Sequence, residues 1–198
     1  MKVLVACEYS GRVRDAFAAQ GHYALSCDLL PTESPGHHYQ GDVTTLLHPD
    51  HDWDMLIAFP PCTYLAASGM HWTTRGIRDP QLTEDALSFV QLLLNAPVKY
   101  IALENPVGCI SSRIRKPDQY IQPWQFGHQE SKKTCLWLKN LPKLQPTNVV
   151  QKPEFGVWLN QTPSGQNRLG PSATRAKERS LTYAGVAQAM ADQWGNLS

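Results

Sequence analysis

The sequence lacks several features that would assign it to a class of protein at once. It has no C-x-x-C pair, and its five cysteines are an odd number, so we expect neither a disulfide framework nor a zinc site. It lacks an excess of charge, with 18 Lys and Arg against 17 Asp and Glu, so a nucleic acid would have to be bound by a local patch. No apolar run approaches the roughly 18 residues of a membrane span. We therefore expect a cytoplasmic protein with reduced thiols, bound to neither a membrane nor a metal.

What the sequence does contain is an alternation of short apolar runs and helical patterns. Runs typical of β-strands cover 2–8, 23–29, 54–60 and 99–106, and helical patterns cover about 11–20 and 80–95. Near-continuous apolar strands separated by helices predict a mostly parallel sheet covered on both faces, so the fold class is α/β. A chain of 198 residues is expected to form one domain, residues 1–198.

The pattern changes after Pro106. "YIQPWQFG" (120–127) and "KTCLWL" (133–138) predict two strands joined by the polar turn "HQES", as an antiparallel hairpin at a sheet edge. Residues 142–176 are rich in Pro, Gly, Asn, Gln, Ser and Thr, which predicts an extended loop over most of this segment. A final helix is expected over about 185–194, where Val186, Met190 and Trp194 recur at helical spacing.

Polar residues stand at several predicted strand ends, where open parallel sheets bind ligands. A full phosphate-binding G-x-G-x-x-G is absent, which argues against NAD or ATP and favours a nucleoside cofactor without a phosphate chain. Asp28 lies at the end of the second strand, in a position suited to ribose hydroxyls, and Asp42 of "QGDV" could accept a hydrogen bond from an adenine amino group. Each acid alone could equally be a solvated carboxylate or a helix cap. The candidate cofactor residues around the first two strands are Cys7, Glu8, Ser10, Gly11, Asp28 and Asp42.

Two further strand ends carry a thiol and a carboxyl group. The run "LIAFPPC" ends at Cys62, and "IALENP" ends in Glu104 and Asn105. A strand that finishes in two prolines must leave the sheet, which would carry Cys62 to the mouth of the crevice. A thiolate that adds to carbon six of cytosine makes carbon five nucleophilic, and an acid at ring nitrogen N3 stabilises the developing charge. That chemistry requires one cysteine and one carboxyl group on the same side of one pocket.

The other cysteines fit a different interpretation. A cysteine is more often a small buried hydrophobic residue than a nucleophile. Cys27 and Cys135 fall in apolar strand patterns, as does Cys7, and Cys109 follows a glycine in a loop. For Cys62, the pairing with Glu104 favours reactivity.

At these residues the chain resembles a family. Phe59-Pro60-Pro61-Cys62 is similar to the Pro-Cys motif of the cytosine-5 DNA methyltransferases, and Glu104-Asn105-Pro106 is similar to their Glu-Asn-Val motif. The resemblance implies a Rossmann-like fold, S-adenosylmethionine as cofactor, and methylation of carbon five of cytosine. Other motifs of the family have counterparts in the same order across nearly the whole chain: "ACEYSGRVRDAF", Asp28, "GDV", "GHQESKKTCLWL", "RSLT" and the helix from Gly185.

The resemblance also implies roles for individual residues. Cys62 would be the nucleophile and Glu104, next to Asn105, the acid. Lys132 would support the cytosine carbonyl, with Arg113 and Arg115 as competitors for that role. Pro60 joins the candidate cofactor residues named above. The candidate substrate-binding residues are Pro61, Arg75, Arg78 and Lys133.

The chain departs from the family's pattern in four places. Its cofactor turn has one glycine, its Glu-Asn motif continues with proline, and Lys132-Lys133 stands where the family has Arg-x-Arg. The fourth departure is size, because 134–178 replaces a target-recognition domain, with 142–178 as a loop-rich remnant. Such minimal members are typical of phages and prophages. We expect DNA as the substrate, with the cytosine flipped out or single-stranded. RNA, a free nucleotide, the sequence context, the transferred group and the oligomeric state stay open.

Two segments are candidates for contacts with a nucleic acid backbone. The loop "TYLAASGMHWTTRGIRD" (63–79) carries Trp72 and two arginines, and is either a mobile segment that closes on the substrate or an ordinary surface loop. The distal loop carries four basic residues, which could equally form a solvated flank: Arg168, Arg175, Lys177 and Arg179.

The same sequence allows three alternative functions. "AFPPCTY" (58–64) echoes the Asp/Asn/Ser-Pro-Pro-aromatic site of the exocyclic-amino DNA methyltransferases, although Phe59 supplies no polar group there. The chain could also be a non-catalytic, nucleic-acid-binding relic of a methyltransferase. A metal site is the weakest candidate, because the histidines lack ligand spacing on a common element: His37, His38, His48 and His51.

Overall fold

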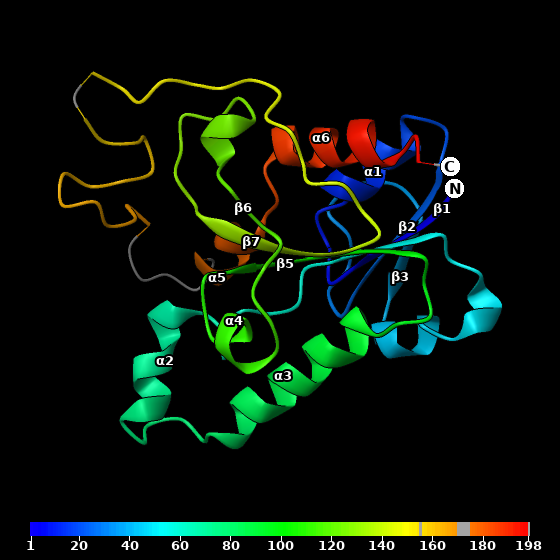
Figure 1. The fold of residues 1–198 in the computed structure, drawn as a ribbon, viewed down its shortest axis with the longest axis horizontal. Helices are drawn as coiled ribbons and strands as arrows, with labels where there is room; N and C mark the ends of the chain where they lie inside the picture. Colours follow the sequence, from blue (N-terminus) through cyan, green and yellow to red (C-terminus); the bar gives the residue numbers. More distant parts are fainter. Residues whose placement is uncertain (155, 170–174, 198) are drawn as a thin grey trace.

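The computed structural model describes residues 1–154, 156–169 and 175–197. Within them the strands form one seven-stranded sheet in the order β3-β2-β1-β4-β5-β7-β6 (Figure 1). The predicted α/β class is confirmed. The strands are β1 (Lys2–Ala6), β2 (Tyr23–Asp28), β3 (His38–Gln40), β4 (Met55–Ala58), β5 (Tyr100–Pro106), β6 (Gln119–Ile121) and β7 (Thr134–Lys139).

Five of the strands are parallel, and the last two form an antiparallel pair at one edge. β3, β2, β1, β4 and β5 run parallel to their neighbours, whereas β7 is antiparallel to both β5 and β6. This arrangement confirms the prediction of a mostly parallel sheet with an antiparallel edge hairpin. Glu104 is paired with Leu136 across β5 and β7, so the hairpin brings the segment before β7 next to the end of β5.

Helices cover both faces of the sheet, because its central strands are apolar on both sides. Side chains alternate along a strand, and β1 places Val3 and Val5 in one core cluster and Leu4 and Ala6 in the other. Figure 1 shows α1 and α6 on one face, and α3 with α4 on the other. The helices are α1 (Arg12–Ala18), α2 (Ala67–Thr74), α3 (Gln81–Leu94), α4 (Ile110–Arg113), α5 (Arg175–Ser180) and α6 (Ala184–Trp194).

The structure corrects three local predictions. β6 is shorter than the predicted strand over 120–127, because Pro123 begins a short 3-10 helix, η3 (Pro123–Gln125). Helix α2 lies within the segment predicted as a loop, and none of its residues is buried. The predicted extended loop over 142–176 ends in the first residues of α5, and residues 155 and 170–174 of it lie outside the described part of the chain.

Three remaining elements are short. They are the edge strand β3, which was not predicted, and the 3-10 helices η1 (Val43–Leu46) and η2 (Pro49–His51). None of the helices in the described residues is long and apolar enough to cross a membrane.

Candidate active site

The carboxyl ends of β1, β2, β4 and β5 meet at one edge of the sheet, as their parallel registers require. Cys7 follows β1 and has a left-handed backbone, with φ of 58°. The pKa of Cys7 is raised to about 12, first by burial and then by nearby groups that include the carboxylates of Asp28 and Asp42. The structure therefore brings these three sequence-predicted residues close together.

Glu8 occupies the beginning of helix α1. Its carboxylate accepts hydrogen bonds from the backbone N–H groups of Val13 (2.7 Å) and Arg14 (3.3 Å), and the Ser10 hydroxyl lies 3.4 Å away. Burial raises the pKa of Glu8, while these N–H groups oppose the shift. In dinucleotide-binding folds the N–H groups of this turn bind phosphate. Here the Glu8 carboxylate accepts from these N–H groups instead. Together with the missing glycines, this argues against a cofactor that binds through a phosphate.

Asp28 and Asp42 each keep one carboxylate oxygen available. Oδ1 of Asp28 accepts from the Leu30 backbone N–H at 2.9 Å, and Oδ1 of Asp42 accepts from that of Thr44 at 2.9 Å, at the start of η1. Neither Oδ2 atom has a partner among the residues that the structure describes. Two carboxylate oxygens at adjacent strand ends could therefore accept hydrogen bonds from a nucleoside.

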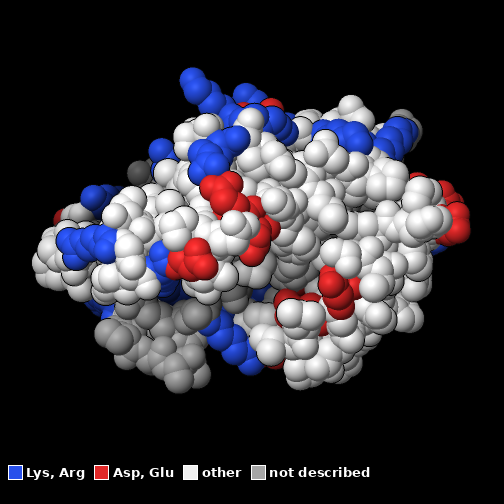
Figure 2. All heavy atoms as spheres, turned by 90° about the horizontal axis from the view of Figure 1, so that it is seen from below, with Lys and Arg blue, Asp and Glu red and all other residues white. Residues whose placement is uncertain are grey.

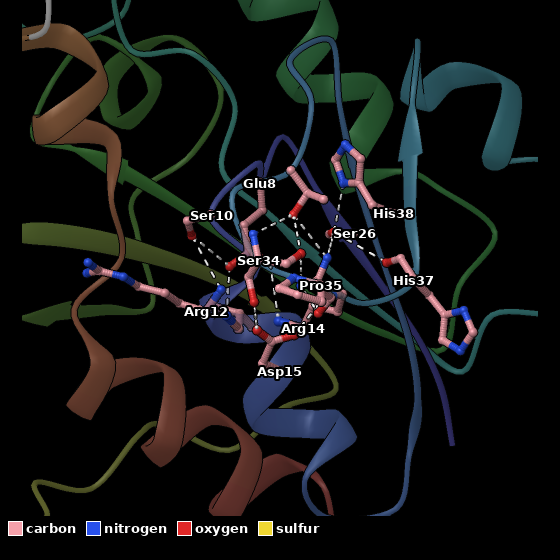
Figure 3. Close-up of polar contacts among 12 residues, drawn as sticks. Glu8, Ser10, Arg12, Arg14, Asp15, Ser26, Ser34, Pro35, His37 and His38 are labelled. Carbon is pink, nitrogen blue, oxygen red and sulfur yellow. Dashed lines mark hydrogen bonds and ion pairs between the residues drawn. The ribbon is translucent and has the colours of Figure 1, made fainter.

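A buried arginine that the sequence analysis missed supports this part of the site. Arg14 is 1% exposed, and Figure 3 shows its guanidinium among groups of the segment after Asp28. A signal was available, since Arg14 lies between Val13 and Phe17 on the inward side of a short amphipathic helix. Its five N–H groups bond Asp15 Oδ1 (2.8 Å), Ser26 Oγ (3.1 Å), Thr32 Oγ1 (3.2 Å), and the carbonyls of Ser34 (3.0 Å) and Pro35 (3.1 Å).

The single glycine of the cofactor turn is explained by the same arginine. Gly11 has φ of 76°, a left-handed conformation that favours glycine. A Cβ at Gly11 would lie 2.3 Å from Arg14 Nη2, and one at Gly36 would lie 2.7 Å from Arg14 Cζ. The guanidinium thus fills the space between the turn and the loop after β2.

Cys62 lies in a tight turn directly after β4. Its carbonyl accepts from the backbone N–H groups of Leu65 (3.0 Å) and Ala66 (2.9 Å). The Cys62 side chain is exposed, yet the surrounding turn excludes enough water to raise the pKa of the thiol. The Glu104 carboxylate raises this pKa further, whereas Lys132 and Arg179 lower it. The structure therefore brings Cys62, Glu104 and Lys132 into one charged environment.

Glu104 and Asn105 are held by the neighbouring strands. The Thr134 hydroxyl contacts Glu104 Oε1 and also lies 3.1 Å from the Asn105 carbonyl. Asn105 is 1% exposed, and its Nδ2 donates to the carbonyl of Pro60 at 2.8 Å. This bond ties the Glu-Asn segment to the residue two positions before Cys62. Asn105 Oδ1 is buried and has no hydrogen-bond partner in the described part of the protein.

A pocket opens beside Glu104 and Lys132. It holds about 370 Å³ of empty space, part of which is open to solvent. Lys132 Nζ donates to the Arg179 carbonyl at 2.7 Å and lies 5.9 Å from the centre of the Tyr183 ring. The other lining residues are mostly apolar: Phe59, Ile121, Pro123, Thr134, Ser180, Leu181, Thr182, Tyr183, Val186 and Met190.

The two competitors of Lys132 have other partners. Arg113 pairs with Glu84 at 2.9 Å, and Arg115 pairs with Asp118 at 2.8 Å. Lys133 lies over the ring of Tyr120 at 4.4 Å, on the edge strand, and does not line the pocket. Of these four cations, only Lys132 lines the pocket.

The segment after Cys62 holds one arginine and leaves the other free. Arg78 Nη1 donates to the Thr63 carbonyl at 2.9 Å, and its guanidinium lies 5.5 Å from the Tyr64 ring. Arg75 is exposed and has no side-chain partner within the described ranges. Trp72 on α2 is also exposed, with 41% of its surface accessible. Figure 2 shows that Lys and Arg side chains lie scattered among acidic and uncharged residues on one face of the molecule, without a continuous basic patch.

No cluster of three or more His, Cys, Asp or Glu residues suited to a metal ion occurs in 1–154, 156–169 or 175–197. The histidines singled out in the sequence serve other contacts. His38 bonds Ser26 Oγ at 2.9 Å, and His48 pairs with Asp50 at 3.2 Å.

Two solved structures resemble this fold. An E. coli protein assigned as a DNA modification methyltransferase encoded within a prophage is 14% identical, with a TM-score of 0.50 over 76% of this chain and 52% of that one. The Entamoeba histolytica methyltransferase EhMeth is 13% identical, with a TM-score of 0.51 over 76% of this chain and 57% of that one. The chain thus spans just over half the length of each. No family model and no curated protein matches the sequence. The chain has the Rossmann-like α/β fold of these methyltransferases.

Proposed function

We propose that this protein uses S-adenosylmethionine to methylate carbon five of cytosine in DNA. The observation that carries the proposal is that Glu104 and Lys132 line one pocket and both act on the Cys62 thiol by their charge, at the strand ends of a methyltransferase fold. A thiol, a carboxyl group and a cation are the three groups that attack on a cytosine ring requires.

The residues at the ends of β1 and β2 fit the cofactor. Glu8 closes the helix terminus to phosphate, which suits a nucleoside without a phosphate chain. The free oxygens of Asp28 and Asp42 would accept hydrogen bonds from the ribose and the adenine amino group. Cys7, Ser10, Gly11 and Pro60 would contribute the surrounding wall. When bound, the cofactor supplies an electrophilic methyl group on its sulfonium.

The proposed chemical steps at the base use the thiol and the carboxyl group in turn. The thiol proton of Cys62 would pass to the Glu104 carboxylate and from it to N3, while Cys62 Sγ forms a bond to carbon six and the electron pair moves onto carbon five. Carbon five then takes the methyl group. Water would accept the proton from carbon five, expulsion of the Cys62 thiolate would restore the aromatic ring, and N3 would return its proton to Glu104. Each bond formed to sulfur is broken again, so the protein is unchanged after one turnover.

Lys132 and Asn105 have supporting roles. Lys132 would donate to the cytosine carbonyl as a point charge, since an ammonium lacks the fork of a guanidinium. Asn105 fixes Pro60, and therefore the turn that presents Cys62, against the strand that presents Glu104.

A DNA substrate is supported by the name of the E. coli neighbour, and the prophage origin of that protein suits a minimal phage-type enzyme. The segment between β7 and α5 is too short for a separate reading domain. A cytosine inside a duplex is out of reach, so the base would be flipped out or single-stranded. Pro61, Arg75, Arg78 and Lys133 remain candidates for contacts with the strand.

Product analysis tests the proposal against the alternatives. The protein is incubated with labelled cofactor and with single-stranded or duplex oligonucleotides, which are then digested to nucleosides and weighed. 5-Methylcytosine that is lost in Cys62→Ala and retained in Cys109→Ala supports the proposal. A methyl group on the exocyclic nitrogen would assign the protein to the amino-methyltransferases. Binding of cofactor and oligonucleotide without any methylated product would favour the non-catalytic relic.

A further inference from the structure

Residues 177–183, named here the closing strap, lie across the site and are anchored on both sides by their backbone carbonyls. The Tyr9 hydroxyl donates to the Lys177 carbonyl at 2.8 Å, and Arg12 Nη1 donates to the Thr182 carbonyl at 2.8 Å. Between these two points, Lys132 Nζ donates to the Arg179 carbonyl at 2.7 Å. The backbone of Arg179 is therefore fixed beside the proposed catalytic cation.

The basic side chains of this region differ in whether they have partners. Lys177 forms an ion pair with Glu33 at 2.5 Å and lies over the Tyr9 ring, and Arg168 Nε donates to the Gln161 carbonyl at 2.7 Å. The side chain of Arg175 lies outside the described residues. The guanidinium of Arg179 is exposed and has no hydrogen bond or ion pair within the described part of the chain. The planar N–H donors of this guanidinium are therefore available to a ligand next to the site.

The position of Arg179 indicates what it could bind. Its charge, with that of Lys132, acts on the Cys62 thiol, and Ser180 and Leu181 after it line the pocket beside Glu104. A cytosine that enters this pocket from a nucleic acid brings its own phosphate to the rim. Arginine binds phosphate through two parallel N–H···O bonds, and such contacts fix the register of a strand.

We infer that Arg179 binds a phosphate group of the nucleotide whose base occupies the pocket between Glu104 and Lys132. This inference rests on the proposed function and narrows its substrate class to phosphate-bearing cytosines, in a strand or as a nucleotide. Free cytosine and its nucleoside would lack the group that the strap recognises. The strap thus joins the two halves of the site, since Tyr9 and Arg12 of the cofactor turn hold the segment that binds the substrate phosphate.

The test is a binding measurement that requires no turnover. Fluorescence anisotropy is recorded for labelled single-stranded DNA and RNA oligonucleotides with one cytosine, with S-adenosylhomocysteine present. Arg179→Ala should bind both about 10-fold more weakly, and its affinity should fall less steeply with salt, by about 0.7 in the slope of log K against log salt. Arg179→Lys should recover part of the affinity. Lys143→Ala removes an exposed cation away from the pocket and should bind as the wild type does.

Competition by small ligands identifies the recognised group. Cytidine monophosphates should compete with the oligonucleotide in the wild type and compete less well in Arg179→Ala, whereas nucleosides should compete equally weakly in both. Equal affinity and equal salt dependence in wild type and Arg179→Ala, with unchanged melting temperatures, would overturn the inference. So would slower alkylation of Cys62 in Arg179→Ala without any change in binding, because Arg179 would then act on the thiol alone.

The outcome is separable from that of the proposed function. Arg179-dependent binding without 5-methylcytosine in the product assay would leave the phosphate contact standing and contradict the chemistry. 5-Methylcytosine formation together with binding that does not depend on Arg179 would support the chemistry and contradict the phosphate contact.

Discussion

Cys62 is exposed, yet its environment holds it in the protonated form. The pKa of its thiol is raised from the ordinary 9.0 by burial and by Glu104, and Lys132 and Arg179 only partly oppose this. The thiolate of the proposed reaction would therefore form only when the substrate enters, as the thiol proton passes to the Glu104 carboxylate and from it to N3 of the cytosine. The two residues act on each other before they act on cytosine.

Replacing Glu104 by glutamine separates thiol reactivity from catalysis. Without the carboxylate the pKa of Cys62 falls, so at pH 8 its alkylation by iodoacetamide should be faster than in the wild type, while methylation is lost. The wild-type rate should keep rising with pH beyond 9.0, the ordinary thiol value. Peptide mass spectrometry measures the rate at Cys62, with Cys109 as an internal control whose charged neighbours are Arg113 and Glu84. Slower alkylation in Glu104→Gln would show that the carboxylate does not face the thiol.

At the scale of elements, backbone hydrogen bonds join the turn after Cys62 to the segment after Glu104. The N–H of Cys109 donates to the Leu65 carbonyl at 2.9 Å, and that of Ala67 donates to the Val107 carbonyl at 3.0 Å. Gly108 lies at the crossing, where a Cβ would be 2.0 Å from the Leu65 carbonyl oxygen. Because Leu65 belongs to the Cys62 turn and Gly108 follows Glu104, these bonds set how the two segments meet.

Gly108→Ala should therefore damage chemistry more than cofactor binding. The methyl group would force the two backbones apart, at a cost of about 1–3 kcal/mol in the free energy of unfolding, and would displace Cys62 from Glu104. We expect methylation to fall by a factor of 10 or more, with affinity for S-adenosylhomocysteine changed little, by calorimetry. Gly21→Ala is the control: its φ of 82° makes alanine costly there, but a Cβ meets nothing within 4 Å, so stability should fall without the loss of methylation. Equal losses of turnover and of cofactor affinity would contradict this role.

Arg14 holds the loop between β2 and β3 by hydrogen bonds to Thr32, Ser34 and Pro35. Arg14→Lys keeps the charge but removes the planar fork, leaving several buried acceptors unsatisfied. We expect a loss of about 2–4 kcal/mol in the free energy of unfolding and weaker binding of S-adenosylhomocysteine, because the loop after Asp28 loses its support. Denaturant unfolding and calorimetry measure the two effects. Unchanged cofactor affinity in a destabilised Arg14→Lys would show that the loop does not shape the cofactor site.

These elements also show what the sequence could and could not reveal. The placement of Cys62 and Glu104 at one edge of the sheet was predictable, because apolar runs indicate where strands end and parallel strands end at the same edge. Helix α2 was not, because it has no buried residue and hence no apolar periodicity. The contacts of the closing strap could not be predicted for a different reason. Tyr9 bonds Lys177 across 168 positions of the sequence, and local sequence patterns carry no information about such a contact.

At the scale of the whole molecule, the balanced charge and the short chain bear on how a nucleic acid could be bound. The face drawn in Figure 2 carries charges of both signs, and the chain spans just over half of each methyltransferase of similar fold. Because this face has no continuous basic patch, contacts with many phosphates of a duplex would add little to the affinity. We therefore expect the proposed enzyme to recognise one exposed nucleotide through a small number of contacts made by the pocket and the closing strap.

The measurement that tests the central claim most directly uses 5-fluorocytosine, whose fluorine blocks loss of the group from carbon five. The protein is mixed with cofactor and with single-stranded or duplex oligonucleotides containing this base, and the products are separated under denaturing conditions and weighed. The account predicts a covalent adduct at Cys62, in higher yield with the single strand, which disappears in Cys62→Ala and persists in Cys109→Ala. Absence of an adduct with both substrates, or an adduct that survives in Cys62→Ala, would contradict it.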